Sequence, residues 1–120
     1  LIKNGKISDL VKERARIAFA SGADGVICSA SDIKKVRQLK FPTKKLIVTP
    51  GIRPKGSLKN DQKRTGDPAT ALHDGADFLV IGRPITASEY PLKALNKITG
   101  QILLSLNNEK NHEKNKKIAM

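Results

Sequence analysis

Two segments of this sequence place a glycine and an arginine directly behind an apolar run. The first is Thr49-Pro50-Gly51-Ile52-Arg53, which follows Leu46-Ile47-Val48. The second is Gly82-Arg83, which follows Phe78-Leu79-Val80-Ile81. A glycine lets the backbone approach a ligand closely, and the guanidinium fork of arginine matches the oxygens of a phosphate group. The two segments together predict a phosphate-binding site at the ends of two buried strands.

A long polar segment follows the first of these motifs. Residues 50–66 have neither helical nor strand periodicity, and loops of this length in compact domains are usually functional or mobile. Gln62 lies inside this segment, where its amide is able to fold over a bound ligand and donate to it. From the residues alone, Gln62 is equally well explained as an exposed loop residue, and Arg83 as a solvated arginine.

The elements that must position these residues alternate along the chain. Helices are predicted over residues 9–21, 32–39, 69–73 and 90–106, with Ser8, Ser31 or Asp32, and Asp67 as caps. Strands are predicted over residues 24–30, 45–49 and 78–81. This alternation is typical of an α/β fold in which three parallel strands with flanking helices are joined by right-handed crossovers. A sheet of only three strands leaves much apolar surface uncovered.

Residues 1–106 therefore form one predicted unit, and residues 107–120 are predicted to be a disordered basic polar tail. The tail is rich in Asn and Lys and lacks periodicity. Because the first residue is Leu1 and not methionine, we expect the chain to begin inside a longer reading frame, or to have been trimmed or truncated.

The net charge of +12 is concentrated in one part of the chain. Between Lys44 and Arg64 there are seven basic residues and one acid, which is half of that net charge. With no Trp, one Tyr and three Phe, the chain lacks the aromatic residues on which single-stranded nucleic acids stack. A small anionic ligand is the better interpretation, and a basic nucleic-acid binder is the weaker alternative.

Other classes of site find little support. Cys28 is the only cysteine and lies in an apolar strand, so we expect a buried small hydrophobe in a reducing cytoplasm. No apolar run approaches the roughly 18 residues of a membrane span, so no membrane partner is expected. His73 and His112 stand far apart without a neighbouring acidic or cysteine cluster, so neither a metal nor a cofactor is expected.

Residues 22–30, 48–62 and 75–86 resemble strands six, seven and eight of bacterial-type orotidine 5′-monophosphate decarboxylases. The resemblance covers roughly residues 8–98. It implies part of a (β/α)8 barrel, because a whole barrel needs roughly 200 to 250 residues. It also implies that Arg53, Gln62, Gly82 and Arg83 bind the nucleotide, chiefly through its phosphate. One departure is Asn60, which stands where the family pattern has a glycine before Asp61-Gln62.

The catalytic residues of that family have no counterpart here. Family members decarboxylate with a lysine and an Asp-x-Lys-x-x-Asp motif, and the chain contains no complete copy of the motif. Asp32-Ile33-Lys34 has Arg37 in the last place, and Asp61-Gln62-Lys63 has Gly66. We therefore assign no catalytic residue and expect the chain alone to be inactive.

The leading hypothesis is the C-terminal, phosphate-binding part of such a decarboxylase, which converts orotidine monophosphate to uridine monophosphate and CO2 in pyrimidine biosynthesis. The expected partners are the phosphate of orotidine or uridine 5′-phosphate and either a second copy of the chain or an N-terminal half-barrel. The alternative is a non-catalytic remnant that acts as a self-associating or phosphate-ligand-binding module. A different phosphate-binding barrel is also compatible with the Gly82-Arg83 motif.

Overall fold

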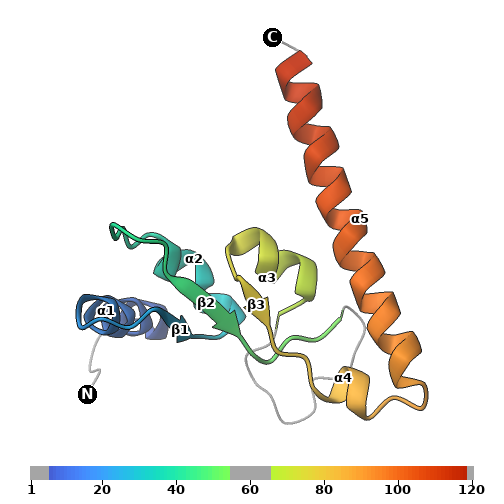
Figure 1. Cartoon of the computed structure of the whole chain (residues 1–120), viewed down its shortest axis with the longest axis horizontal. Helices are drawn as coiled ribbons and strands as arrows, with labels where there is room; N and C mark the ends of the chain where they lie inside the picture. The colour runs from blue at the N-terminus through green and yellow to red at the C-terminus, as the bar shows by residue number, and fades with distance from the viewer. Residues whose placement is uncertain (1–5, 55–65, 119–120) are drawn as a thin grey trace.

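The computed structural model describes residues 6–54 and 66–118, with side chains described up to Glu109. Figure 1 shows the elements in the order α1 (Ile7–Ala20), β1 (Gly25–Ile27), η1 (Ala30–Asp32), α2 (Ile33–Arg37), β2 (Leu46–Thr49), α3 (Pro68–Asp74), β3 (Phe78–Leu79), α4 (Arg83–Thr86) and α5 (Pro91–Ile118). The alternation of helices and strands predicted from the sequence is confirmed.

The three strands form one parallel sheet in the order β1-β2-β3. The register pairs Val26 with Ile47 and Thr49 with Leu79. Each strand is shorter than predicted, and β1 and β3 each pair with one neighbour only among the described residues. The Cys28 amide still donates to the Val48 carbonyl over 3.1 Å, so the backbone ladder continues just past the end of β1.

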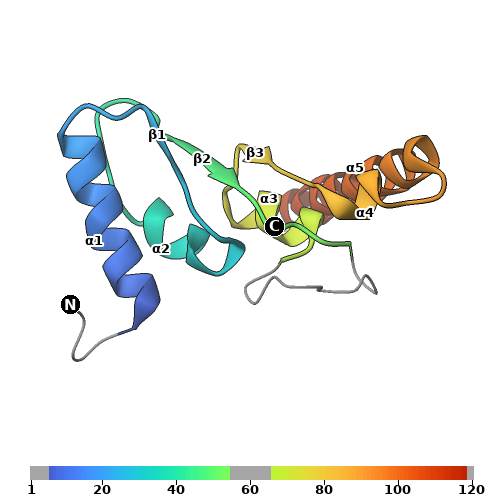
Figure 2. The ribbon, with the colours of Figure 1, turned by 90° about the horizontal axis from the view of Figure 1, so that it is seen from below.

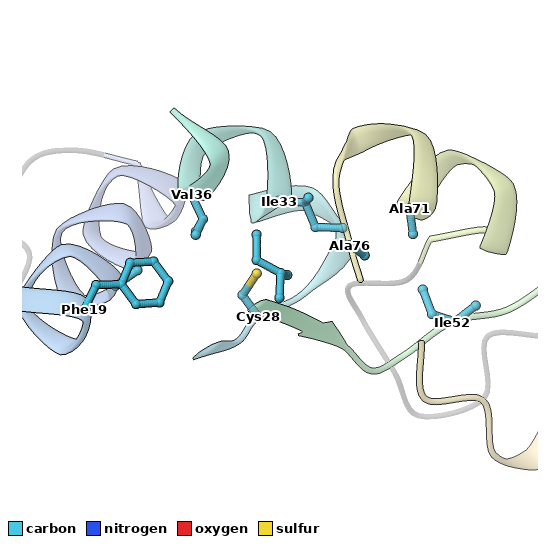
Figure 3. Packing of buried hydrophobic residues seen from close by; sticks show 9 residues of the cluster. Phe19, Cys28, Ile33, Val36, Ile52, Ala71 and Ala76 are labelled. Carbon is cyan, nitrogen blue, oxygen red and sulfur yellow. The ribbon is translucent and has the colours of Figure 1, made fainter. Parts of the chain in front are cut away.

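The buried apolar residues lie between the sheet and the helices. In Figure 2, α2 and α3 lie on one side of the strands. Figure 3 shows the side chains that meet there, with Ile33, Ile47 and Ile52 essentially inaccessible. The expectation that Cys28 is a buried small hydrophobe is confirmed by its 7% exposure. The cluster comprises Ala15, Phe19, Cys28, Ile33, Val36, Ile47, Ile52, Ala71 and Ala76.

The predicted cap at Ser8 is wrong, and Asp32 occupies the N-cap position of α2 without a capping hydrogen bond from its side chain. Helix α1 begins at Ile7, so Ser8 lies inside its first turn and donates a hydrogen bond to Asp32 Oδ1 over 3.0 Å. Asp32 precedes α2 but makes no side-chain cap there, because its carboxylate is buried and also accepts from the Ser29 hydroxyl over 2.9 Å. Ser31 lies within η1 and does not start α2.

The start and end of α3 follow the sequence pattern. Asp67 is the N-cap and accepts from the Thr70 amide over 3.1 Å, and Pro68 occupies the first turn. Gly75 ends the helix with φ +122°, a conformation that residues with a side chain rarely adopt.

Helix α5 differs most from expectation. It does not end near Leu106 but continues to Ile118, through most of the segment expected to be irregular. Residues 107–118 contain no Gly or Pro and include Glu and Lys, which are good helix formers. Extending an existing helix costs less than starting one. The lack of an apolar stripe was therefore a poor indicator of where this helix ends.

A polar clamp joins the segments that precede β2 and β3. Arg37 donates to the Lys45 carbonyl over 2.6 Å and to the Gly75 carbonyl over 2.8 Å, and its guanidinium also pairs with Asp77. Asp77 accepts from the Ile47 amide over 2.8 Å and pairs with Lys44 over 3.0 Å. Burial opposes ionisation of Asp77, but these donors outweigh it and hold its pKa below the ordinary value.

Candidate functional site

The two predicted phosphate-binding segments leave the sheet side by side. Thr49 pairs with Leu79, and the Val80 amide donates to the Thr49 carbonyl over 2.9 Å. Because β2 and β3 are parallel, the chain continues from both at the same edge, as Figure 1 shows. In parallel α/β folds, ligand-binding loops lie at this carboxyl edge of the strands.

The long segment after β2 is joined at its base. Gly51 has φ +69°, and the chain then forms an isolated parallel bridge between Ile52 and Gly66. Within it the Arg53 amide donates to the Gly66 carbonyl over 2.9 Å. Since Ile52 is buried in the core, the base of the loop is fixed to the core of the domain.

Gly66 was not singled out by sequence reasoning, although it helps to shape this edge. A Cβ at Gly66 would stand 2.4 Å from the Cβ of Ala30, which follows β1. No side chain fits at that separation, so only a glycine lets the loop base lie against the end of β1. The base of the loop, which follows β2, therefore also packs against the segment that follows β1. A glycine next to a helix cap such as Asp67 is the only signal in the sequence, and it is weak.

Arg53 is buried at this edge, with 7% of its surface exposed. Its Nε is inaccessible and has no hydrogen-bond partner among the described residues, and the Thr49 hydroxyl is in the same condition. Within that described part, the Arg53 side chain makes no ion pair with a carboxylate. A buried cation without a counter-charge is costly, so this position favours binding of an anion.

The other predicted site residues are placed differently. Gly82 precedes α4 with φ −101°, and apart from its chain neighbours no atom of the described residues lies within 4 Å of the position that a Cβ would take. Arg83 is the first residue of α4 and is exposed. The structure thus brings the two segments to one edge of the sheet, with one arginine buried and the other at the surface. Gln62 and Asn60 lie outside the described residues.

Other sites are not supported in the described part of the chain. No group of three or more His, Cys, Asp or Glu side chains is arranged to hold a metal ion there. His73 is exposed, and its Nδ1 contacts Glu109 Oε1 at 2.5 Å, an interaction between α3 and α5. No helix in the described part of the chain is both long enough and apolar enough to cross a membrane.

Comparison with known proteins agrees with this arrangement. Residues 1–98 match the sequence profile of the Orotidine 5′-phosphate decarboxylase / HUMPS family. The chain is 46% identical over 102 residues to orotidine 5′-phosphate decarboxylase of Jannaschia sp. (strain CCS1), and 50% identical over 88 residues to that of Dichelobacter nodosus (strain VCS1703A). These matches cover 85% and 73% of the chain, but only 44% and 38% of the two relatives.

A solved structure gives the same answer. The crystal structure of orotidine 5′-phosphate decarboxylase from Lactobacillus acidophilus superposes with a TM-score of 0.64 at 34% identity, covering 82% of this chain and 39% of that one. The three parallel strands and their helices are therefore part of a (β/α)8 barrel, and the chain spans about two fifths of the proteins it matches. The chain belongs to the orotidine 5′-phosphate decarboxylase / HUMPS family.

Proposed function

We propose that this chain is the phosphate-binding part of an orotidine 5′-phosphate decarboxylase, and that Arg53, Gln62, Gly82 and Arg83 hold the 5′-phosphate of orotidine or uridine monophosphate. The observation that carries the proposal is the buried Arg53 side chain, whose Nε has no hydrogen-bond partner and which makes no ion pair with a carboxylate among the described residues. A phosphate supplies the missing negative charge and accepts charge-assisted hydrogen bonds.

The remaining groups have complementary roles in this proposal. The exposed guanidinium of Arg83 closes on the phosphate from the surface, and the open space beside Gly82 admits a phosphate oxygen close to the backbone. The basic residues of the loop, which include Lys55, raise the local concentration of anions.

Phosphate binding has a catalytic use even far from the reacting carbon. Binding energy from a remote group helps to close a loop and to stabilise the transition state. In the proposed reaction orotidine monophosphate loses CO2 to give uridine monophosphate. Because the chain contains no complete Asp-x-Lys-x-x-Asp motif, we propose that it binds the nucleotide without converting it when it is alone.

Calorimetric titration of the chain with uridine 5′-monophosphate, inorganic phosphate and uridine tests the proposal. We expect saturable binding of the nucleotide, weaker binding of phosphate, and no binding of uridine. Replacing Arg83 by alanine should weaken nucleotide binding by about 1.5 to 3 kcal/mol, the contribution of a hydrogen bond to a charged group. Binding of uridine as tight as that of its monophosphate would contradict a phosphate-directed site.

A free-standing binding module is the second candidate function. It rests on the same buried Arg53, because a site built around this side chain needs no catalytic residue to bind a phosphate. On this alternative the chain binds uridine monophosphate but never supports release of CO2 from orotidine monophosphate, even when the rest of a family barrel is supplied. An assay for CO2 release from such a mixture separates the two candidates.

A further inference from the structure

The sheet has one apolar face that the helices do not cover. The register places Ile27, Val48 and Phe78 in one row across the three strands. Ile27 and Phe78 are exposed to 74% and 58%, whereas Ile47, on the opposite face of β2, is fully buried. Leu46 and Val80 alternate onto the same open face and are also exposed. An apolar face of this kind in a parallel sheet is normally covered by other protein.

The two outer edges of the sheet are also unpaired among the described residues. Within the described residues, β1 and β3 each pair only with β2, so each has an outer edge of backbone groups without a strand partner. Beside β1, a hollow of about 260 Å³ lies between α1 and the strand and is lined by Val11, Ala15 and Ile27 among others. Five of the six residues that line this hollow are apolar, so apolar side chains of a further element can fill it.

The opposite flank carries an apolar stripe on α5. Ile98 and Ile102 face the domain, whereas Leu92, Leu95, Leu103 and Leu106 are exposed on an adjacent side of the helix. The molecule therefore exposes apolar surface in three places: on the open face of the sheet, in the hollow beside β1 and on α5. One occupant that covers all three surfaces must reach from the outer edge of β1 across the sheet to α5.

We propose that these surfaces dock onto a polypeptide that carries the first five β-α units of a family barrel, and that covalent continuity is not needed for docking. Three strands are present here, and a (β/α)8 barrel has eight. The curated relatives contain more than half of their length outside the matched region. A second copy is a poorer occupant, because it brings the same net charge of +12 and only three more strands.

The experiment mixes this chain with the separately produced N-terminal part of the Jannaschia relative, ending where the matched region begins. Size-exclusion chromatography with light scattering should show a one-to-one complex at micromolar concentration. Phe78→Asp and Ile27→Asp each place a charge on the open sheet face and should abolish the complex. Ile17→Asp is the matched control, because Ile17 is exposed on α1 between the buried Ala15 and Phe19 and points away from the sheet.

Circular dichroism of each variant checks that the helices are retained, which we expect because Phe78 and Ile27 are exposed in the isolated chain. The proposal is overturned when no complex forms with the wild-type chain, when Phe78→Asp and Ile27→Asp both leave the complex intact, or when the wild-type chain forms a homodimer that Phe78→Asp dissociates. Arg53→Met should leave the complex intact, so failure of docking and failure of phosphate binding are distinguishable.

Discussion

Arg37 and Asp77 lie 40 residues apart in the sequence, and their side chains form an ion pair next to the start of β2. The same guanidinium donates to the carbonyl oxygens of Lys45 and Gly75. One side chain therefore joins α2 to the segments that enter β2 and β3. In barrels of this type, residues at the N-terminal ends of the strands support stability, and the opposite end carries function.

Removing this clamp should destabilise the domain strongly. Arg37→Ala leaves the Asp77 carboxylate and two carbonyl groups without this donor, and we expect a loss of about 2 to 4 kcal/mol in the free energy of unfolding. Urea denaturation measures it. Arg16→Ala is the control, because Arg16 pairs with Glu13 at the surface, where both side chains are about half exposed, and it should have no measurable effect. Equal effects of the two substitutions would refute the role of the clamp.

The same carboxylate predicts how stability depends on pH. The pKa of Asp77 is lowered in the folded chain, so its contribution is present above the ordinary value of 3.8 and is lost as the pH falls below it. The unfolded chain binds the proton more readily, and acid therefore favours unfolding. We expect the wild-type free energy of unfolding to drop between neutral pH and pH about 3.

Asp77→Asn isolates this contribution. The variant should be less stable at neutral pH and should lose less stability in acid than the wild type. A residual acid dependence is expected, because hydrogen bonds from Lys35 and Arg16 also lower the pKa values of Asp9 and Glu13. Urea denaturation at several pH values measures the slope, and an unchanged slope in the variant would show that Asp77 is not responsible.

Two glycines with positive φ provide a test of close packing. A Cβ at Gly75, with φ +122°, would stand 2.7 Å from Cγ of Arg37, whereas a Cβ at Gly22, with φ +107°, has no atom of another described residue beyond its chain neighbours within 4 Å. Gly22→Ala should cost about 1 kcal/mol from backbone strain alone. Gly75→Ala should cost more, because it also displaces Arg37 from the clamp. Thermal unfolding of both variants gives the comparison, and equal losses would mean that Arg37 moves aside freely.

Local patterns made much of the fold predictable from the sequence. The cap at Asp67, the proline after it and the glycine at position 75 bound the seven residues of α3, and the apolar run before Thr49 marks a buried strand. The pairing of Ser8 with Asp32 was not predictable, because both residue types are good helix caps and only tertiary burial decides against that role.

The placement of the two predicted binding segments at one edge of the sheet was predictable for a similar reason. The Gly-Arg and Gly-Ile-Arg motifs lie beside each other because parallel strands end at a common edge. The burial of Arg53 and the contact between Gly66 and Ala30 depend on how residues far apart in the chain meet. No local pattern of residues reports such a contact. The nucleotide-binding roles of Arg53, Gln62, Gly82 and Arg83 all stay predictions.

The measurement that most directly tests the central claim is thermal unfolding of wild-type chain and Arg53→Met, each with and without uridine 5′-monophosphate. Methionine fills the space of the arginine side chain without its charge. The free variant should therefore be more stable than the free wild type, and nucleotide should stabilise only the wild type, by about 2.7 kcal/mol at a hundred times Kd. Arg14→Met, at an exposed position on α1, should retain the nucleotide effect. A free Arg53→Met variant that is less stable than wild type yet still stabilised by nucleotide would contradict the account.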